Sequence, residues 1–464
     1  MRYRPCLARR PKVLYTGRGV SYLRIPFASP LWAVFFLLFT EAGAAANVAE
    51  SLGLGARAIA LGNAYTAIAD DFTSVYYNPG GLSSAPESKL TIGALWARPY
   101  FYYQEHGGAR VRPHLYSTGS LYIGVSSNLG HLTGYSQLRK WTLGLSFYAP
   151  VERALLADIP NESTEKRFIF YLDQTQVMAI SAGLSFQILH SLSIGVAGNF
   201  LADLRAPNEA DVEADIRTVI PYLAGASDLA KKVRPRIMRD AELKAAPILG
   251  VRFTPVGWFS CGLTFRGKFY AETVGTQDIL IRFKDFSERS EGMLQSAVLA
   301  DIHYVHYWTP NELAFGLAMR PRRDILVAAD LTWSDWSDYI DPQWRVPERK
   351  FSDTFTPRIG LEYVRPPGFA VRAGYGFQPS PVPEQTGAAN YLDNDKHVFS
   401  FGMGYTFARS PLAIWKKPLT VNCYVQYQQL VKRHYHKTVE ASSENTLSFG
   451  GHLVHAGVDI VLHF

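Results

Sequence analysis

Long stretches of the chain alternate between apolar and polar residues with a period of two. In WFSCGLTFRGKFY (258–270), Phe259, Cys261, Leu263 and Phe265 fall on one face, while polar or small residues fall on the other. Such alternation is typical of β-strands that bury one face only. The pattern predicts strands, not helices, as the main elements of the chain.

The same alternation recurs at 369–378 and at the end of the chain, where Val458, Ile460 and Leu462 share a face. Aromatic residues gather near the strand ends, as in the interfacial girdles of membrane barrels. Fourteen strands are predicted, near 87–104, 114–130, 139–151, 168–188, 192–205, 243–255, 258–275, 311–321, 325–340, 351–364, 369–380, 396–408, 419–433 and 446–464.

The lengths of the links between these strands give an independent test. The links after strands four, six, eight and ten are short, and read LHS, PVG, RPRRD and RPPG. Short periplasmic turns that alternate with long extracellular loops are typical of outer-membrane barrels, which have an even number of strands. The long links follow the odd strands, at 105–113, 152–167, 206–242, 276–310, 341–350, 381–395 and 434–445.

We therefore predict an all-β fold, a transmembrane antiparallel β-barrel of about 14 strands with an N-terminal hatch, or plug, inside the lumen. The barrel should occupy 87–464 and carry its longest extracellular loops at 206–242 and 276–310. A soluble β-sandwich also has alternating strands. It needs neither the regular change from short to long links nor strands of ten residues or more throughout, so the pattern favours the membrane barrel.

The first part of the chain reads as a targeting sequence. Residues 31–39, LWAVFFLLF, are too few to span a bilayer and suit the apolar region of a signal peptide. A basic stretch precedes them and small residues follow, so we expect a signal peptide at 1–46. No later segment has the length and apolar character of a transmembrane helix.

The signal peptide also accounts for most of the charge. The chain carries +7, and residues 1–46 hold seven basic side chains and one acid, which leaves about +1 for the remainder. A nucleic-acid partner is not expected, because the basic charge does not cluster on the folded part. Cys261 and Cys423 could form one disulfide, but they read more simply as small apolar residues on separate strands.

Residues 47–86 lie between the signal peptide and the first strand, and they read as the hatch. The stretch GLGARAIALGNAYTAIAD is small, apolar and rich in glycine, so it can pack inside a polar-walled tube. Asn78, Pro79 and Gly80 begin a tight turn, since proline fixes φ and glycine allows positive φ. Asp70 and Asp71 can accept hydrogen bonds from nearby backbone groups.

GLGARAIALGNAYTAIADDFTSVYYNPGGL resembles the N-terminal hatch of the FadL/TodX family of outer-membrane transporters for hydrophobic compounds. The resemblance continues at 331–339, LTWSDWSDY, and is densest at 355–408. It covers most of 47–464 and is weakest at 152–250 and 276–310. It implies a fourteen-stranded barrel with a hatch in the outer membrane of a Gram-negative bacterium.

The resemblance also implies a function, the passive transport of long-chain fatty acids or similar hydrophobic molecules. Capture by the loops at 206–242 and 276–310 would be followed by transfer to a lumenal pocket, and by release downwards or sideways as the hatch shifts. The family's Asn-Pro-Ala hatch motif maps onto Asn78, Pro79 and Gly80, where glycine should loosen the turn. A plain structural turn is the alternative to a gate.

Four cations on the polar faces of strands could pair with a carboxylate of a ligand, namely Arg266, Lys268, Arg358 and Arg372. The alternative is salt bridging within the wall. Glu362 shares a strand face with Arg358, and Asp330 lies on a neighbouring strand, so mutual neutralisation is available.

Other chemistry is weakly supported. Gly53-x-Gly55-x-x-Ala58 follows no strand, which argues against a dinucleotide site, and the paired histidines lack further ligands for a metal. We therefore expect no enzyme, cofactor or metal. Partners should be a hydrophobic small molecule, outer-membrane lipid and the barrel-assembly machinery. The alternatives are a transporter of aromatic hydrocarbons, an adhesin or structural barrel, or a barrel hydrolase.

Overall fold

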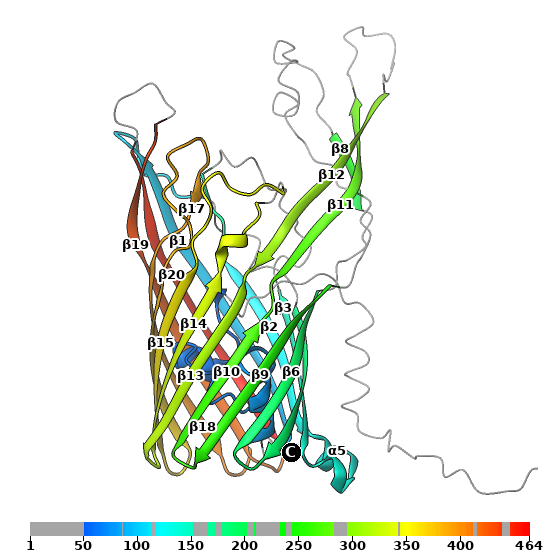
Figure 1. Cartoon of the computed structure of the whole chain (residues 1–464), viewed down its shortest axis with the longest axis vertical. Coiled ribbons are helices and arrows are strands. Elements are labelled where there is room, and N and C mark those ends of the chain that lie inside the picture. The colour runs from blue at the N-terminus through cyan, green and yellow to red at the C-terminus, as the bar shows by residue number, and fades with distance from the viewer. Residues whose placement is uncertain are drawn as a thin grey trace, which may run out of the picture. The chain divides into compact units, whose positions relative to one another are not determined.

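The computed structural model (Figure 1) describes residues 51–464 with internal gaps. The expected signal peptide at 1–46 lies outside the described residues. The gaps are 86, 114, 116, 152–165, 172–178, 202–207, 210–232, 238–243, 283–294, 342–343, 412–414 and 439–445. Side chains are also not described for 201, 208–209, 233–237, 244, 271–282, 295–304 and 306–307.

Fourteen antiparallel strands close into a barrel, which confirms the predicted fold class and strand number. Closure pairs every strand on both sides, so no edge is left where water cannot satisfy the backbone. In order around the wall the strands are β1 (Lys89–Glu105), β2 (Thr118–Asn128), β3 (Trp141–Pro150), β5 (Ala179–Leu189), β6 (Leu192–Leu201), β9 (Lys244–Val256), β10 (Phe259–Arg266), β13 (Asn311–Arg322), β14 (Ile325–Asp335), β15 (Thr354–Arg365), β16 (Phe369–Gln378), β18 (Lys396–Phe407), β19 (Leu419–His436) and β20 (Thr446–His463).

The predicted alternation sorts side chains between the two faces of the wall. On β10, Leu263 and Phe265 are exposed on the outside, whereas Ser260 and Thr264 are buried towards the lumen. An apolar outer face and a polar inner face are what a lipid-embedded barrel requires. Among the described residues, no helix combines the length and the apolar character needed to cross a bilayer.

The links at one end of the barrel are mostly tight turns, and this end is called the short-turn end. Four of its links are only two or three residues long, at 190–191, 257–258, 323–324 and 366–368. The link between β2 and β3 is longer and carries α5 (Leu129–Thr133) and η2 (Ser136–Leu138). Figure 1 shows α5 and the C-terminus at this end; the opposite end is the loop end.

The structure corrects the picture of the two longest loops, because both carry strands of a separate four-stranded sheet. The predicted strand 258–275 is in fact two elements, since β10 ends at Arg266 and the chain then leaves the barrel. Its second half begins a strand of this other sheet. The sheet runs in the order β12 (Gln295–Thr309), β11 (Phe269–Arg282), β8 (Val233–Ile237) and β7 (Asn208–Glu209).

The start of the predicted strand 168–188 is also wrong. The barrel strand begins only at Ala179, and Phe168 belongs to β4 (Arg167–Phe168), which pairs with β17 (Tyr391–Leu392). The aromatic residues Phe168, Phe170 and Tyr171 resemble a strand in their spacing, but they are buried against other aromatic rings at the loop end. Beyond β14 a short turn of helix, η4 (Trp336–Asp338), takes part in the same packing.

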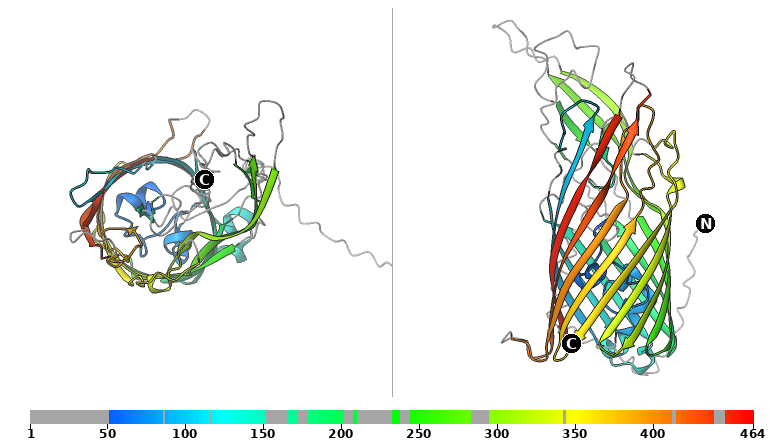
Figure 2. Two further views of the ribbon diagram at one scale, coloured as in Figure 1. Left: turned by 90° about the horizontal axis from the view of Figure 1, so that it is seen from above. Right: turned by 90° about the vertical axis from the view of Figure 1, so that its left-hand side faces the viewer.

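Residues 51–85, called the interior segment, lie inside the barrel (Figure 2, left). The segment has only short helices, α3 (Ala56–Ala60), α4 (Ser74–Tyr77) and η1 (Pro79–Ser84). Gly62 ends the first of them with a φ of +65° and lies so close to the wall that a Cβ would be 2.9 Å from the backbone nitrogen of Tyr375. Only glycine combines that conformation with that approach.

Candidate functional site

Three carboxylates of the barrel wall hold the interior segment. Asp330 accepts hydrogen bonds from the amides of Tyr65 and Thr66, each at 2.9 Å. Asp459 accepts one from the amide of Ala56, also at 2.9 Å. The amide of Ala56 is at the first residue of α3, and those of Tyr65 and Thr66 lie between helices. Such amides have no partner within a helix, so the wall supplies the acceptors that buried amides need.

The third carboxylate, Glu362, binds the only arginine of the interior segment. Arg57 donates from Nε and Nη2 to the two oxygens of Glu362, at 2.9 and 3.0 Å. Arg372, on the adjacent strand β16, donates to the same carboxylate at 2.6 Å. Glu362 is 6% exposed, so this is a buried and charge-assisted arrangement, in which loss of one partner is costly.

The two predicted acids of the segment play different parts. Asp70 pairs with Arg57 at 2.8 Å. Burial opposes the ionisation of Asp70, but the attraction of Arg57 outweighs it, so the pKa of Asp70 lies below its ordinary value. Asp71 accepts hydrogen bonds from the amide of Thr73 at 2.9 Å and from the hydroxyl of Tyr65 at 3.1 Å.

Asn78, Pro79 and Gly80, called the NPG turn, join the segment to the wall near β6 and β9. Asn78 is fully buried; its side-chain amide donates to the carbonyl oxygens of Thr66 at 2.8 Å and Val251 at 2.9 Å. Its side-chain oxygen accepts from the amide of Gly80 at 3.0 Å, which caps η1. The turn is therefore fastened to both the segment and a barrel strand.

Glycines of the wall make room for this turn. A Cβ on Gly250 would lie 2.2 Å from Oδ1 of Asn78, and one on Gly195 would lie 2.3 Å from the carbonyl carbon of Pro79. Gly80 itself is packed closely, because its Cβ would lie 3.0 Å from backbone atoms of β9. In this arrangement the glycine of the turn permits close contact with the wall.

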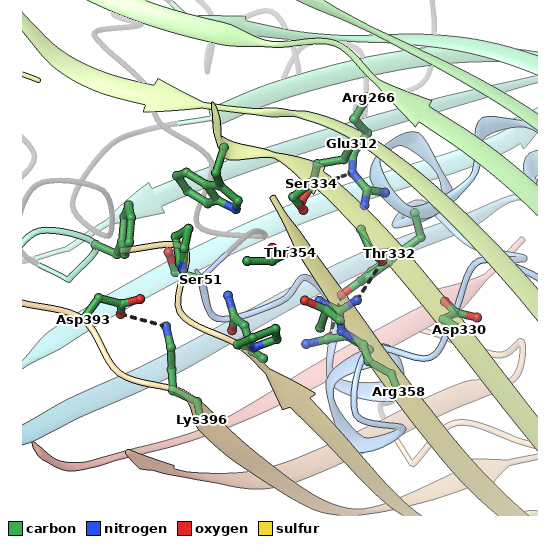
Figure 3. Close-up of a pocket in the computed structure, with 18 of the residues that line it drawn as sticks. Ser51, Arg266, Glu312, Asp330, Thr332, Ser334, Thr354, Arg358, Asp393 and Lys396 are labelled. Atoms are coloured by element: carbon green, nitrogen blue, oxygen red, sulfur yellow. Dashed lines mark hydrogen bonds and ion pairs between the residues drawn. The ribbon is translucent and has the colours of Figure 1, made fainter. Parts of the chain in front are cut away.

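Between the interior segment and the loop end lies a small lumenal cavity of about 60 Å³ (Figure 3). Hydroxyl groups of neighbouring strands line its wall, and tyrosines of the segment form its floor. The residues discussed below that line it are Tyr76, Tyr77, Tyr171, Arg266, Glu312, Thr332, Trp336, Arg358, Asp393 and Lys396.

Two of the four predicted cations line this cavity. Arg266 donates to Glu312 at 2.7 Å, and its guanidinium lies 4.8 Å from the ring of Tyr76. Arg358 donates to the hydroxyl of Thr332 at 2.9 Å. The sequence suggested that Glu362 and Asp330 would neutralise Arg358. In the structure Glu362 pairs with Arg57 and Arg372. Asp330 binds amides of the segment, but it faces Arg358 across the β14–β15 ladder and still attracts it.

The other two predicted cations do not line the cavity. Lys268 follows the end of β10 and is exposed, where it pairs with Asp338 at 3.0 Å. Arg372 lies deeper, bound to Glu362 and to the side-chain oxygen of Asn422 at 3.0 Å. Alternation placed Arg372 on the correct face but could not show which height of the lumen it occupies.

Sequence reasoning missed Lys396 at the top of the cavity. Its Nζ lies 3.6 Å from Oδ1 of Asp393 and 4.8 Å from the ring centre of Tyr171. Asp393 and Lys396 are both buried. Lys396 stands at the first residue of β18, and the spacing of Asp393 and Lys396, three residues apart, was the available signal.

Aromatic rings from three loops, called the aromatic cap, cover the loop end of the cavity. Trp336 packs against Phe170 with ring centres 4.9 Å apart and against Trp308 at 5.5 Å. Tyr339 continues the row, stacked on Phe351 at 4.3 Å. Trp308 belongs to the aromatic sequence HYVHYW (303–308) of the predicted capture loop 276–310.

An apolar groove marks the outer face of the wall behind the NPG turn. Trp141, Phe186, Val196, Leu249, Phe265 and Leu313 are among the side chains that line it. Gly195 and Gly250 lie in its floor, and the lumenal side of both glycines touches the NPG turn. Only the backbone of β6 and β9 separates the groove from the interior segment at this point.

The described residues were also compared with the patterns of metal and disulfide sites. Within the described part of the chain, no three His, Cys, Asp or Glu side chains gather as metal ligands. Cys261 and Cys423 are separate free cysteines, and Cys423 is exposed on the outer wall.

Comparisons with known proteins agree with the fold. The family described as outer membrane protein transport protein (OMPP1/FadL/TodX) matches residues 36–435. Alkane uptake protein A of Marinobacter nauticus is 24% identical over 416 residues, which are 84% of this chain and 85% of that protein.

Solved structures of low identity share the fold. The toluene transporter TodX of P. putida is 16% identical, with a TM-score of 0.56 over 89% of this chain and 99% of that one. A FadL homologue of Pseudomonas aeruginosa is 14% identical, with a TM-score of 0.54 over 90% and 99%. The chain therefore belongs to the outer membrane protein transport protein (OMPP1/FadL/TodX) family, and it is an outer-membrane transporter of hydrophobic compounds.

Proposed function

We propose that the transported compounds are long-chain fatty acids, whose carboxylate binds Arg358 in the lumenal cavity. The observation that carries this proposal is the partner of Arg358, which is a hydroxyl group of Thr332. Among the ion pairs of the described residues, none involves Arg358, whereas Arg266, Arg372 and Lys396 each have a carboxylate within 4 Å. Arg358 is therefore the cavity cation best able to accept a new anion.

The surroundings of Arg358 suit an amphipathic ligand. A carboxylate beside the guanidinium would gain charge-assisted hydrogen bonds in a site partly shielded from water. The rings of Phe170, Tyr171 and Trp336 line the same cavity towards the loop end and offer an apolar surface to an alkyl chain. A few polar groups that fix a head group, with apolar walls beside them, are typical of such sites.

Long-chain alkanes are the second candidate. The relative from Marinobacter nauticus is named as an alkane uptake protein, and it matches most of the chain. An alkane would contact the rings of the aromatic cap and would not need the charge of Arg358. The two candidates therefore differ in a single measurable property, the dependence of uptake on one cation.

We propose further that the interior segment is the hatch, and that 206–242 and 276–310 capture the substrate outside the cell. Docked against the wall, the segment fills the lumen below the cavity. Movement of the NPG turn would free a path to the short-turn end, or sideways towards the apolar groove behind Gly195 and Gly250. The barrel-assembly machinery and outer-membrane lipid complete the proposed partners.

The role of Arg358 can be tested by removing its charge. In cells that lack their own outer-membrane fatty-acid transporter, Arg358→Met should lower the uptake of a labelled long-chain fatty acid by about tenfold. Loss of one hydrogen bond to a charged group costs about 1.5–3 kcal/mol. The lower of these values corresponds to about a tenfold change, so uptake should fall at least tenfold. Uptake of a labelled alkane of equal length should stay within twofold of wild type, a margin of about 0.4 kcal/mol.

Lys268→Met is the matched control, because Lys268 is an exposed cation outside the cavity, and it should change neither uptake. Equal loss of fatty-acid and alkane uptake in Arg358→Met would show that Arg358 shapes the channel and does not recognise a carboxylate. Alkane uptake without any fatty-acid uptake in the wild type would favour the second candidate.

A further inference from the structure

The outer rim of the short-turn end carries a band of exposed cations. They come from the links between β2 and β3, β13 and β14, β15 and β16, and β18 and β19, so they span the rim from β13 through β20 to β3. This basic collar consists of Arg139, Lys140, Arg322, Arg323, Arg365, Arg409, Lys416 and Lys417.

Few acids balance the collar. Around the same rim the described side-chain carboxylates outside the lumen are Asp324 and Glu87. Asp324 forms an ion pair with Arg322 at 2.9 Å, and the carboxylate of Glu87 lies 3.3 Å from the ring nitrogen of His463. The rest of the collar therefore faces its surroundings with one sign of charge.

The loop end differs, because acids and cations alternate there. Exposed carboxylates of this end include Asp338, Glu348 and Asp353, and they lie on the same loop as Arg345, Arg349 and Lys350. Among the described residues, the positive band is thus found at the short-turn end and not at the loop end. The formal charge of about +1 after residue 46 hides this asymmetry.

Exposed aromatic side chains place the collar at the depth of lipid head groups. Trp258 is 58% exposed in the turn between β9 and β10, and Tyr135 is 48% exposed beside Arg139. Tyr363 and Tyr405 are exposed on the outer wall, two and four residues from Arg365 and Arg409 respectively. Aromatic girdles lie at the boundary between hydrocarbon and water, so cations immediately beyond them meet the phosphate groups.

We propose that the basic collar binds the phosphate groups of anionic phospholipids in the leaflet that the short turns face. Each lysine or arginine close to an anionic membrane surface adds to the attraction, and the effect fades within a Debye length. An acidic soluble protein would also be attracted by the charge, but the adjoining aromatic girdle belongs at a membrane boundary. A ring of bound anionic lipid would fix the height of the barrel in the bilayer.

The proposal can be tested by tryptophan quenching in vesicles. The full-length protein is reconstituted into phosphatidylcholine vesicles that contain either brominated phosphatidylglycerol or the same fraction of brominated phosphatidylcholine. Two tryptophans lie next to collar residues in the chain, because Trp141 directly follows Lys140 and Trp415 directly precedes Lys416. We expect the brominated anionic lipid to quench about twice as strongly, and 0.5 M salt to remove the excess, because salt screens exposed charges.

Two variants, each lacking four cations, locate the effect. The collar variant should lose the excess quenching, and a matched variant of the loop end should keep it. The collar variant combines Arg139→Gln, Lys140→Gln, Lys416→Gln and Lys417→Gln, and the loop-end variant combines Arg110→Gln, Arg112→Gln, Lys350→Gln and Lys432→Gln. Both must show the heat-modifiable gel mobility of a folded barrel.

Equal quenching of the wild type by the two brominated lipids would overturn the proposal. So would an excess that survives in the collar variant or disappears in the loop-end variant. If the collar instead bound an acidic protein, the wild type would show no preference between the lipids.

Discussion

Replacing Glu362 with alanine should open the barrel to ions. The change leaves Arg57 and Arg372 buried without the carboxylate that both contact. Removing one partner of a buried ion pair costs roughly 3–5 kcal/mol, which is a factor of roughly one hundred to several thousand in an equilibrium. The interior segment should move in response, because the barrel strands are held by complete ladders of backbone hydrogen bonds.

Single-channel recording in a planar bilayer measures this effect. The wild type should be closed for most of the time, and Glu362→Ala should show frequent or permanent conductance. Asp324→Ala is the control, since Asp324 forms an ion pair with Arg322 at the short-turn end and does not contact the segment. If folded Glu362→Ala stayed as closed as wild type, Glu362 would not be an anchor of the segment.

A single methyl group at Gly250 should displace the NPG turn. In Gly250→Ala the new Cβ would lie 2.2 Å from Oδ1 of Asn78 and 2.7 Å from Cδ of Pro79, so the turn must move away from β9. Overpacking of this kind costs about 1–3 kcal/mol, which can break the hydrogen bond from Asn78 to Val251. We expect faster cleavage of the interior segment by a protease added to the short-turn side, and altered uptake of substrate.

The protein supplies a matched control at the end of the same strand. A Cβ on Gly257 would meet no atom within 4 Å, so Gly257→Ala should behave as wild type in both assays. Identical protease sensitivity of the Gly250 and Gly257 variants would argue against close packing of the NPG turn on β9.

The barrel could be predicted from the sequence because each strand is recognised from its own residues. Each strand must present apolar residues to lipid and small or polar residues to the lumen. The sequence therefore alternates with a period of two, as in Leu263, Thr264 and Phe265. The same locality explains the errors. Residues 269–275 also form a strand, but nothing in a two-residue period says which sheet a strand joins, and β11 joins a separate one.

The candidate site was less predictable because its contacts are distant in sequence. Alternation placed Asp330, Arg358 and Glu362 on the inner face, but their partners depend on the height at which the interior segment lies. Arg57 meets Glu362 across 305 residues, and the amide of Ala56 meets Asp459 across 403. The NPG turn was recognisable as a motif, whereas the glycines that receive it, Gly195 and Gly250, are ordinary strand glycines until the turn is placed beside them.

The most direct test of the account is uptake of a labelled long-chain fatty acid by cells that lack their own outer-membrane fatty-acid transporter. The cells would express either the wild type or a variant with Asn78, Pro79 and Gly80 all replaced by alanine. We expect the wild type to restore uptake, and the variant, with a barrel folded to the same extent, to change the rate of uptake. Absence of uptake above the empty host would contradict fatty acids as the substrate, and equal uptake by both proteins would contradict the NPG turn as part of the gate.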